Sequence, residues 1–151
     1  MAVLTFDLED DFTLIGIHSA EEDYKLAFLL NQQLNSHFVR YQYNLDFKGS
    51  EVEFPLFEFK DPNTHINYYL INNKYRQVIE DKDQKELFGG RYSTISYLIP
   101  EKKRIDYFLK IEGVNNTSTF KIVNQLNKIN QIVTSYTIDT NTLKSKNYLI
   151  F

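Results

Sequence analysis

The stretch Ile99-Pro-Glu-Lys-Lys-Arg-Ile-Asp-Tyr-Phe-Leu-Lys-Ile111 contains a charged turn followed by a strand. Pro100 fixes its own φ and suits the first corner of a turn, so residues 100–104 are predicted to connect two strands. From residue 105 the side chains alternate. Ile105, Tyr107, Leu109 and Ile111 are predicted on one face, and Asp106, Phe108 and Lys110 on the other. Ile99 is predicted to end the preceding strand, over residues 92–98, with its side chain pointing inward.

The same period of two predicts a chain rich in strands. Further strands are predicted over residues 12–17, 39–47, 52–60, 65–71, 75–79 and 132–139. In the third of these the alternation slips at Pro55, which marks an edge strand or a bulge because proline cannot donate to a ladder. A hinge between two strands is predicted at Asn72 and Asn73, because asparagine tolerates positive φ.

Two segments have helical periodicity instead. Ser19 and Glu22 have the spacing of a capping box at the start of the first helix. The second helix is predicted to begin near Thr117, Ser118 or Thr119. We therefore expect an α+β fold in a single domain over residues 1–151, with a mostly antiparallel sheet of about six to eight strands and two helices packed on one face. The other face, if uncovered, would present tyrosines and amides.

Composition limits the classes of function. The 151 residues match one domain, and the absence of cysteine excludes disulfides, thiolate catalysis and Cys-ligated metals. The net charge of −3 gives no general attraction to nucleic acid or to an anionic membrane. No stretch approaches the 18 apolar residues of a transmembrane helix, so we expect a cytoplasmic protein without membrane association.

No catalytic motif is present in the sequence. His18, His37 and His65 lack the spacing of a local zinc site, and no nucleophile elbow or glycine-rich phosphate loop occurs. We predict no cofactor and no metal site. An enzyme whose site is assembled from distant residues stays an alternative, although a non-enzyme is favoured.

The densest basic cluster, Lys102-Lys103-Arg104, is flanked by Glu101 and Asp106. One interpretation is a charged connection that keeps a strand edge soluble. The other is a recognition loop, in which Pro100 lowers the ordering cost of binding and the charges give specificity. The candidate partner-binding residues are Pro100, Glu101, Lys102, Lys103, Arg104 and Asp106, whereas Ile99, Ile105 and Tyr107 are predicted to be structural. Glu101 is the residue predicted to be best placed to contact a partner.

Three functional hypotheses follow. The favoured one is a non-catalytic binding or accessory module with a protein partner or a second copy of itself. The apolar segment Tyr148–Phe151 and the edge marked by Pro55 would then be candidate dimer contacts. The second hypothesis is an RNA-associated protein that stacks bases on a tyrosine-rich sheet face, using the residues Tyr69, Tyr75, Arg76, Arg91 and Tyr92. The acidic balance of the chain opposes it. The third is the enzyme named above.

The segment also resembles a known family. Ile99-Pro100-Glu101, three residues, then Ile105-Asp106-Tyr107 is similar to the string that names the IPExxxVDY family, with Ile105 where the family pattern has Val. That family is a group of small proteins found chiefly in Bacteroidetes, with no activity established for it. The resemblance implies a bacterial cytoplasmic protein, and the motif that carries it spans nine residues.

Overall fold

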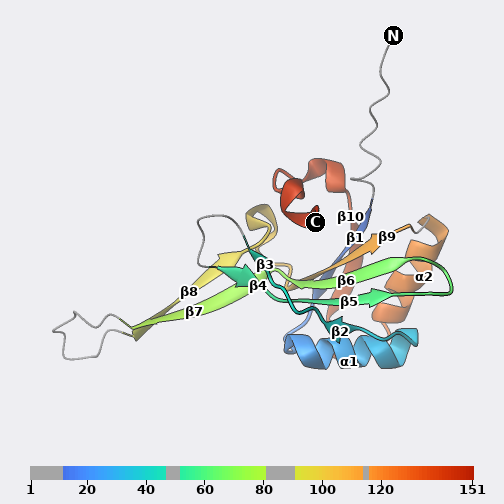
Figure 1. Cartoon of the computed structure of the whole chain (residues 1–151), viewed down its shortest axis with the longest axis horizontal. Coiled ribbons are helices and arrows are strands. Elements are labelled where there is room, and N and C mark those ends of the chain that lie inside the picture. Colours follow the sequence, from blue (N-terminus) through green and yellow to red (C-terminus); the bar gives the residue numbers. More distant parts are fainter. Residues whose placement is uncertain (1–11, 47–51, 81–90, 114–115) are drawn as a thin grey trace, which may run out of the picture.

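The computed structural model describes residues 12–46, 52–80, 91–113 and 116–151. Its centre is a six-stranded antiparallel sheet with the order β10-β1-β9-β6-β5-β2. The strands are β1 (Thr13–His18), β2 (Val39–Arg40), β5 (Leu56–Lys60), β6 (Asn67–Asn72), β9 (Tyr107–Glu112) and β10 (Thr134–Ile138). The predicted α+β fold is therefore confirmed (Figure 1).

Both helices cover one face of this sheet. The helices α1 (Asp23–Leu34) and α2 (Asn116–Leu126) meet through a hydrogen bond from Gln33 Nε2 to Gln125 Oε1, 2.7 Å long. Leu26 and Leu30 of α1 and Leu126 of α2 pack on strand residues of one cluster. These strand residues are Ile15, Ile17, Phe57, Leu70, Tyr107, Leu109 and Ile111. No helix in the described part of the chain has the length and hydropathy needed to cross a membrane.

The opposite face of the sheet is also covered. Residues 98–105 and two short 3-10 turns, Thr140–Thr142 and Lys146–Leu149, pack on it. The second cluster comprises Leu14, Phe54, Leu56, Ile71, Leu98, Ile99, Ile105, Phe108, Ile138, Leu143 and Leu149. Leu149 is fully buried against its own domain, so it is not available as a dimer contact.

One prediction about the sheet faces needs correction. Ile105 does not share a face with Tyr107, because it precedes β9 and packs with Ile99 in the second cluster. A Cβ added to Gly16 would lie 2.9 Å from the Ile105 Cδ1 atom, so the glycine in β1 provides the space for this side chain. Tyr107, Leu109 and Ile111 do share one face, as predicted, and it is the face that the helices cover.

Several local predictions also differ from the structure. Glu22, not Ser19, is the N-cap of α1, and no side chain caps it, so the predicted capping box is wrong. The single strand predicted over 39–47 is two short strands, β2 and β3 (Leu45–Asp46). The single strand predicted over 52–60 is interrupted at Pro55, which separates β4 (Glu53–Phe54) from β5. However, β5 pairs with both β6 and β2, so Pro55 does not mark an open edge there.

The strands β7 (Lys74–Glu80) and β8 (Arg91–Tyr97) pair only with each other among the described residues. They form a two-stranded ribbon that extends away from the rest of the molecule, at the left of Figure 1. We call this ribbon the arm and the remaining described residues the body. The arm begins directly after Asn73 and ends directly before Leu98, which both belong to the body.

Candidate functional site

The segment singled out in the sequence forms a tight turn at the root of the arm. Residues Pro100–Lys102 are a 3-10 turn, and Ile99 before it has extended backbone. The amide of Lys102 donates to the carbonyl of Ile99 at 3.0 Å, and the amide of Ile105 donates to the carbonyl of Lys102 at 3.1 Å. Residues 100–104 are all exposed, whereas Ile99 and Ile105 anchor the two ends of the turn in the core.

Asn73 holds this turn in place from inside the protein. Its side-chain amide donates to the carbonyls of Lys102 at 2.9 Å and Ile105 at 2.8 Å, and its Oδ1 accepts from the amide of Ile99 at 2.8 Å. Its backbone carbonyl accepts from Leu98, and its amide donates to Asp106. Asn73 is 0% exposed, so these bonds satisfy groups that water cannot reach. Asn73 lies between β6 and β7, where the sequence predicts a hinge, and it has no positive φ.

Glu101 is exposed, but the domain itself engages its carboxylate. The amide of Ser145 donates to one carboxylate oxygen at 2.9 Å, and the Ser145 hydroxyl donates to the other at 3.0 Å. Desolvation works to raise the pKa of Glu101, yet the hydrogen bonds from Ser145 outweigh it and leave the pKa below its ordinary value. Glu101 therefore ties the turn to the C-terminal 3-10 segment.

Asp106 and Tyr107 connect the other end of the turn to the start of α1. One carboxylate oxygen of Asp106 accepts from the amide of Ser19 at 2.9 Å, and the other lies 2.8 Å from Lys74 Nζ. The Tyr107 hydroxyl donates to the carbonyl of Glu21 at 2.6 Å. Burial is the main cause of a strongly raised pKa for Tyr107, and the carboxylate of Asp23 raises it further. These contacts give both residues a positional role.

The three cations of the turn, in contrast, face outward around a pocket. Its volume is about 380 Å³, and it is lined by Pro100, Glu101, Lys102, Lys103, Arg104, Ile105 and Tyr136. The Tyr136 hydroxyl lies 2.8 Å from Nε2 of His18. Lys103 Nζ lies 5.6 Å above the ring of Tyr97, a cation–π distance. Neither Lys102 nor Arg104 forms an ion pair with a described residue.

The acidic and basic side chains of the segment thus point in different directions: the carboxylates toward the domain, and the cations toward the pocket. Both carboxylates accept hydrogen bonds from the domain, while Lys102, Lys103 and Arg104 form no ion pair with a described residue. Such a site can bind carboxylate or phosphate groups, and Tyr136 adds an aromatic wall. Sequence reasoning identified the turn but missed Asn73 and Tyr136. The position of Asn73 one residue before a strand was its only local signal, and Tyr136 lies in a distant strand.

A second pocket lies on the other side of Asp106. Its volume is about 220 Å³, and its lining residues are Ser19, Ala20, Glu21, Asn72, Lys74, Asp106 and Tyr107. The Ser19 hydroxyl donates to the carbonyl of Gln131 and accepts from the amide of Glu21, so it too is engaged. Oδ1 of Asn72 is buried without a partner among the described residues. Over the described ranges, no group of three or more potential ligands is arranged to hold a metal ion.

The tyrosines proposed for base stacking do not form one platform. Tyr69 lies in edge contact with Phe151 at 5.1 Å, and partial burial raises its pKa to about 12. Tyr75 packs against Phe54, with ring centroids 6.4 Å apart. Tyr92 is exposed on the arm. Of these three tyrosines, only Tyr69 lies in the central sheet, on the face that the C-terminal segment covers.

Fold and site together define an α+β domain with a rigid, basic surface turn. No family model, no curated protein and no solved structure matches the chain. The resemblance to the IPExxxVDY family therefore stays a prediction that rests on residues 99–107.

Proposed function

We propose that this protein is a non-catalytic binding module that recognises an acidic segment of a partner protein through the Pro100–Arg104 turn. The observation that carries the proposal is the separation of charge within the turn. Glu101 and Asp106 are engaged by Ser145 and by Ser19 with Lys74, which leaves Lys102, Lys103 and Arg104 around the open pocket.

Rigidity of the turn supports a binding role. Asn73, Glu101 and Pro100 fix the backbone that carries the cations, so little backbone entropy is lost when a ligand binds. Cations on an exposed rim act chiefly on association rate and specificity, and salt screens them. The expected interaction is therefore fast, salt-sensitive and of modest affinity.

A direct test is fluorescence anisotropy with a labelled poly-glutamate peptide. We expect binding that weakens as salt is raised, and a loss of about tenfold or more in the variant Lys102→Gln/Lys103→Gln/Arg104→Gln. The matched control, Lys60→Gln/Lys121→Gln/Lys128→Gln, removes the same charge from exposed positions on other elements. Equal losses in the two triple variants would show that net charge, not the turn, drives binding.

The competing RNA hypothesis is tested in the same format with labelled single-stranded RNA. Under the proposal, the RNA binds more weakly than the acidic peptide at every salt concentration. If RNA bound more tightly than the peptide, and this binding depended on the three cations of the turn, the partner would be RNA and not an acidic protein.

A further inference from the structure

The outer part of the arm exposes apolar side chains that the described residues of the body do not cover. Val78 is 62% exposed and Ile95 44% exposed. Residues directly opposite each other in the ladder share a face, so Arg76 with Ile95 and Val78 with Ser93 form one face of the arm. This arm face combines two apolar side chains with the exposed guanidinium of Arg76.

An isolated two-stranded ribbon is only marginally stable in water, because neither face is buried. The root of the arm is fixed, since Tyr75 packs on Phe54 and Lys74 pairs with Asp106. Farther out, the described residues of the body do not cover the arm (Figure 1). A surface of this kind is typical of a contact with another chain.

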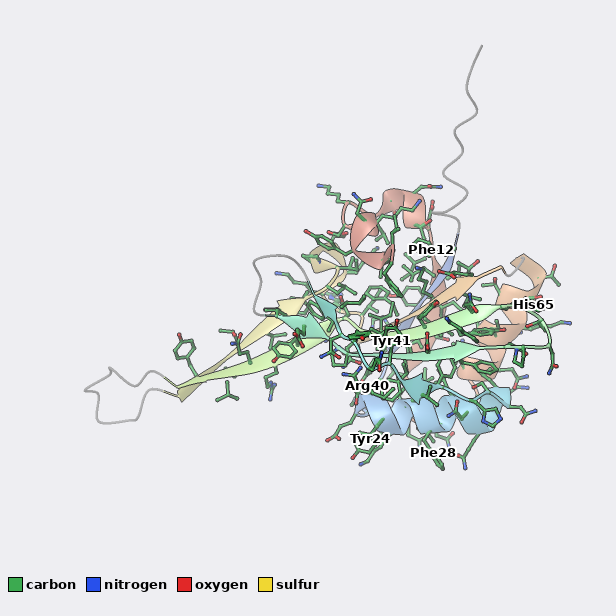
Figure 2. The ribbon with its side chains drawn as sticks, in the orientation of Figure 1. Phe12, Tyr24, Phe28, Arg40, Tyr41 and His65 are labelled. Carbon is green, nitrogen blue, oxygen red and sulfur yellow. The ribbon has the colours of Figure 1, made fainter. Side chains whose placement is uncertain are left out.

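A complementary surface lies on the outer side of α1. Tyr24 is 55% exposed and Phe28 60% exposed, one helical turn apart, and Figure 2 shows both pointing away from the sheet. Exposed Glu22 lies beside them, and a hydrogen bond with its carboxylate is the main cause of the raised pKa of Tyr24. This α1 face is therefore aromatic and acidic, whereas the arm face is aliphatic and basic.

The distribution of charge along the chain agrees with this complementarity. The arm strands, residues 74–80 and 91–97, contain three lysines or arginines and one carboxylate, while residues 21–28 contain three carboxylates and one lysine. One copy of the chain thus carries both an acidic partner surface and a basic one. A two-fold axis lets two copies make the same contact twice, since each supplies an arm and a helix.

We infer that two copies of this chain form a homodimer in which the arm face of each copy lies on the α1 face of the other. In this contact Arg76 pairs with Glu22 of the second copy, and Val78 and Ile95 pack on Tyr24 and Phe28. The inference is independent of the proposed function, because the cations of the Pro100–Arg104 turn take no part in it.

Charge reversal tests the pairing. Sedimentation equilibrium of the full chain, from about 1 to 100 µM, is expected to show a dimer that dissociates more readily at high salt. Arg76→Glu and Glu22→Arg should each raise the dissociation constant about tenfold or more, and the double variant Arg76→Glu/Glu22→Arg should recover most of the loss. Lys121→Glu, an exposed change on α2, should leave the dimer intact.

A matched pair of valines tests the apolar part. Val78→Ser should weaken the dimer about tenfold, whereas Val133→Ser, at an 82% exposed position before β10, should not. A wild-type chain that stays monomeric over this range overturns the inference, as does a double charge variant no better than the single ones. Either result leaves peptide binding by the turn untouched, so the two proposals fail separately.

Discussion

The body and the arm are both antiparallel β-structure, but they differ in how their faces are covered. In the body, two helices cover one face of the sheet, and the C-terminal turns with residues 98–105 cover the other. In the arm, β7 and β8 satisfy their backbone hydrogen bonds with each other and leave side chains such as Val78 exposed. Backbone hydrogen bonds between two strands are therefore enough to form β-structure, but its stability depends on the segments that pack on its two faces.

The two regions meet at Asn73 and the turn that it holds. The buried side chain of Asn73 bonds to the turn, and its backbone is continuous with β7. The turn is thus part of the body by its anchors, although it lies where the arm begins. The basic pocket is therefore anchored in the body and lies next to the root of the arm.

The largest expected difference between body and arm comes from a matched pair of isoleucines. Ile71→Ala removes a fully buried strand side chain and should lower the free energy of unfolding by about 2–5 kcal/mol. Ile95→Ala, on the arm, should lower it by about 1 kcal/mol or less, because the side chain is exposed. Urea unfolding at low protein concentration measures both. Similar losses would mean that the arm is packed as tightly as the body.

The next largest effect is expected at the junction. Asn73→Ala should cost about 2–4 kcal/mol, because the carbonyls of Lys102 and Ile105 and the amide of Ile99 lose their partner. The control is Asn124→Ala at an exposed position of α2, which should change stability by about 0.5 kcal/mol or less. If Asn73→Ala behaved like the control, the turn would not depend on this side chain.

A smaller effect is expected where the C-terminal segment covers the sheet. Phe151 lies with its ring 4.0 Å from Lys110 Nζ, and Tyr69 and Phe12 flank the same ammonium at 5.5 and 5.0 Å. Phe151→Ala should cost about 1 kcal/mol through lost cation–π and apolar contact. Thermal unfolding of Phe151→Ala beside Phe120→Ala, which removes an exposed ring, measures the difference. Equal midpoints would argue against a stabilising aromatic cover over Lys110.

The smallest expected effect is the pH dependence of the contact between Glu101 and Ser145. The pKa of Glu101 is lower in the folded protein than its ordinary value of 4.5, so its stabilisation is present above that value. It is lost as the pH falls through the folded pKa. Between pH 6 and pH 3 the wild type should lose slightly more stability than Glu101→Gln, in urea midpoints.

The sequence predicts the individual strands better than it predicts which segments pack against them. The alternation in β9 correctly places Tyr107, Leu109 and Ile111 on one face, and the slip of the alternation at Pro55 coincides with the gap between β4 and β5. Local patterns report which side of a strand is apolar, but not which distant segment covers it. For that reason the C-terminal cover and the projecting arm were not predicted.

The candidate site shows the same division. The turn and its cluster of cations are visible in residues 99–107, because Pro100 and the run of charges are local features. The hydrogen bonds to the Glu101 carboxylate come from Ser145, and the hydrogen bonds that hold the turn come from Asn73. Both residues are far from the turn in the sequence. Ile105 was placed on the wrong face because the strand begins two residues later than the alternation indicated.

The order of strands in the sheet has a consequence for how the chain folds. β1 lies between β9 and β10, with Thr13 opposite Ile111 and Leu14 opposite Ile138. Closing these pairs requires loops of roughly a hundred residues, and domains dominated by such distant pairings fold slowly. During synthesis, β1 therefore leaves the ribosome long before either neighbouring strand exists. Its apolar residues Leu14, Ile15 and Ile17 stay unpaired until then, and exposed apolar strand residues of this kind favour aggregation.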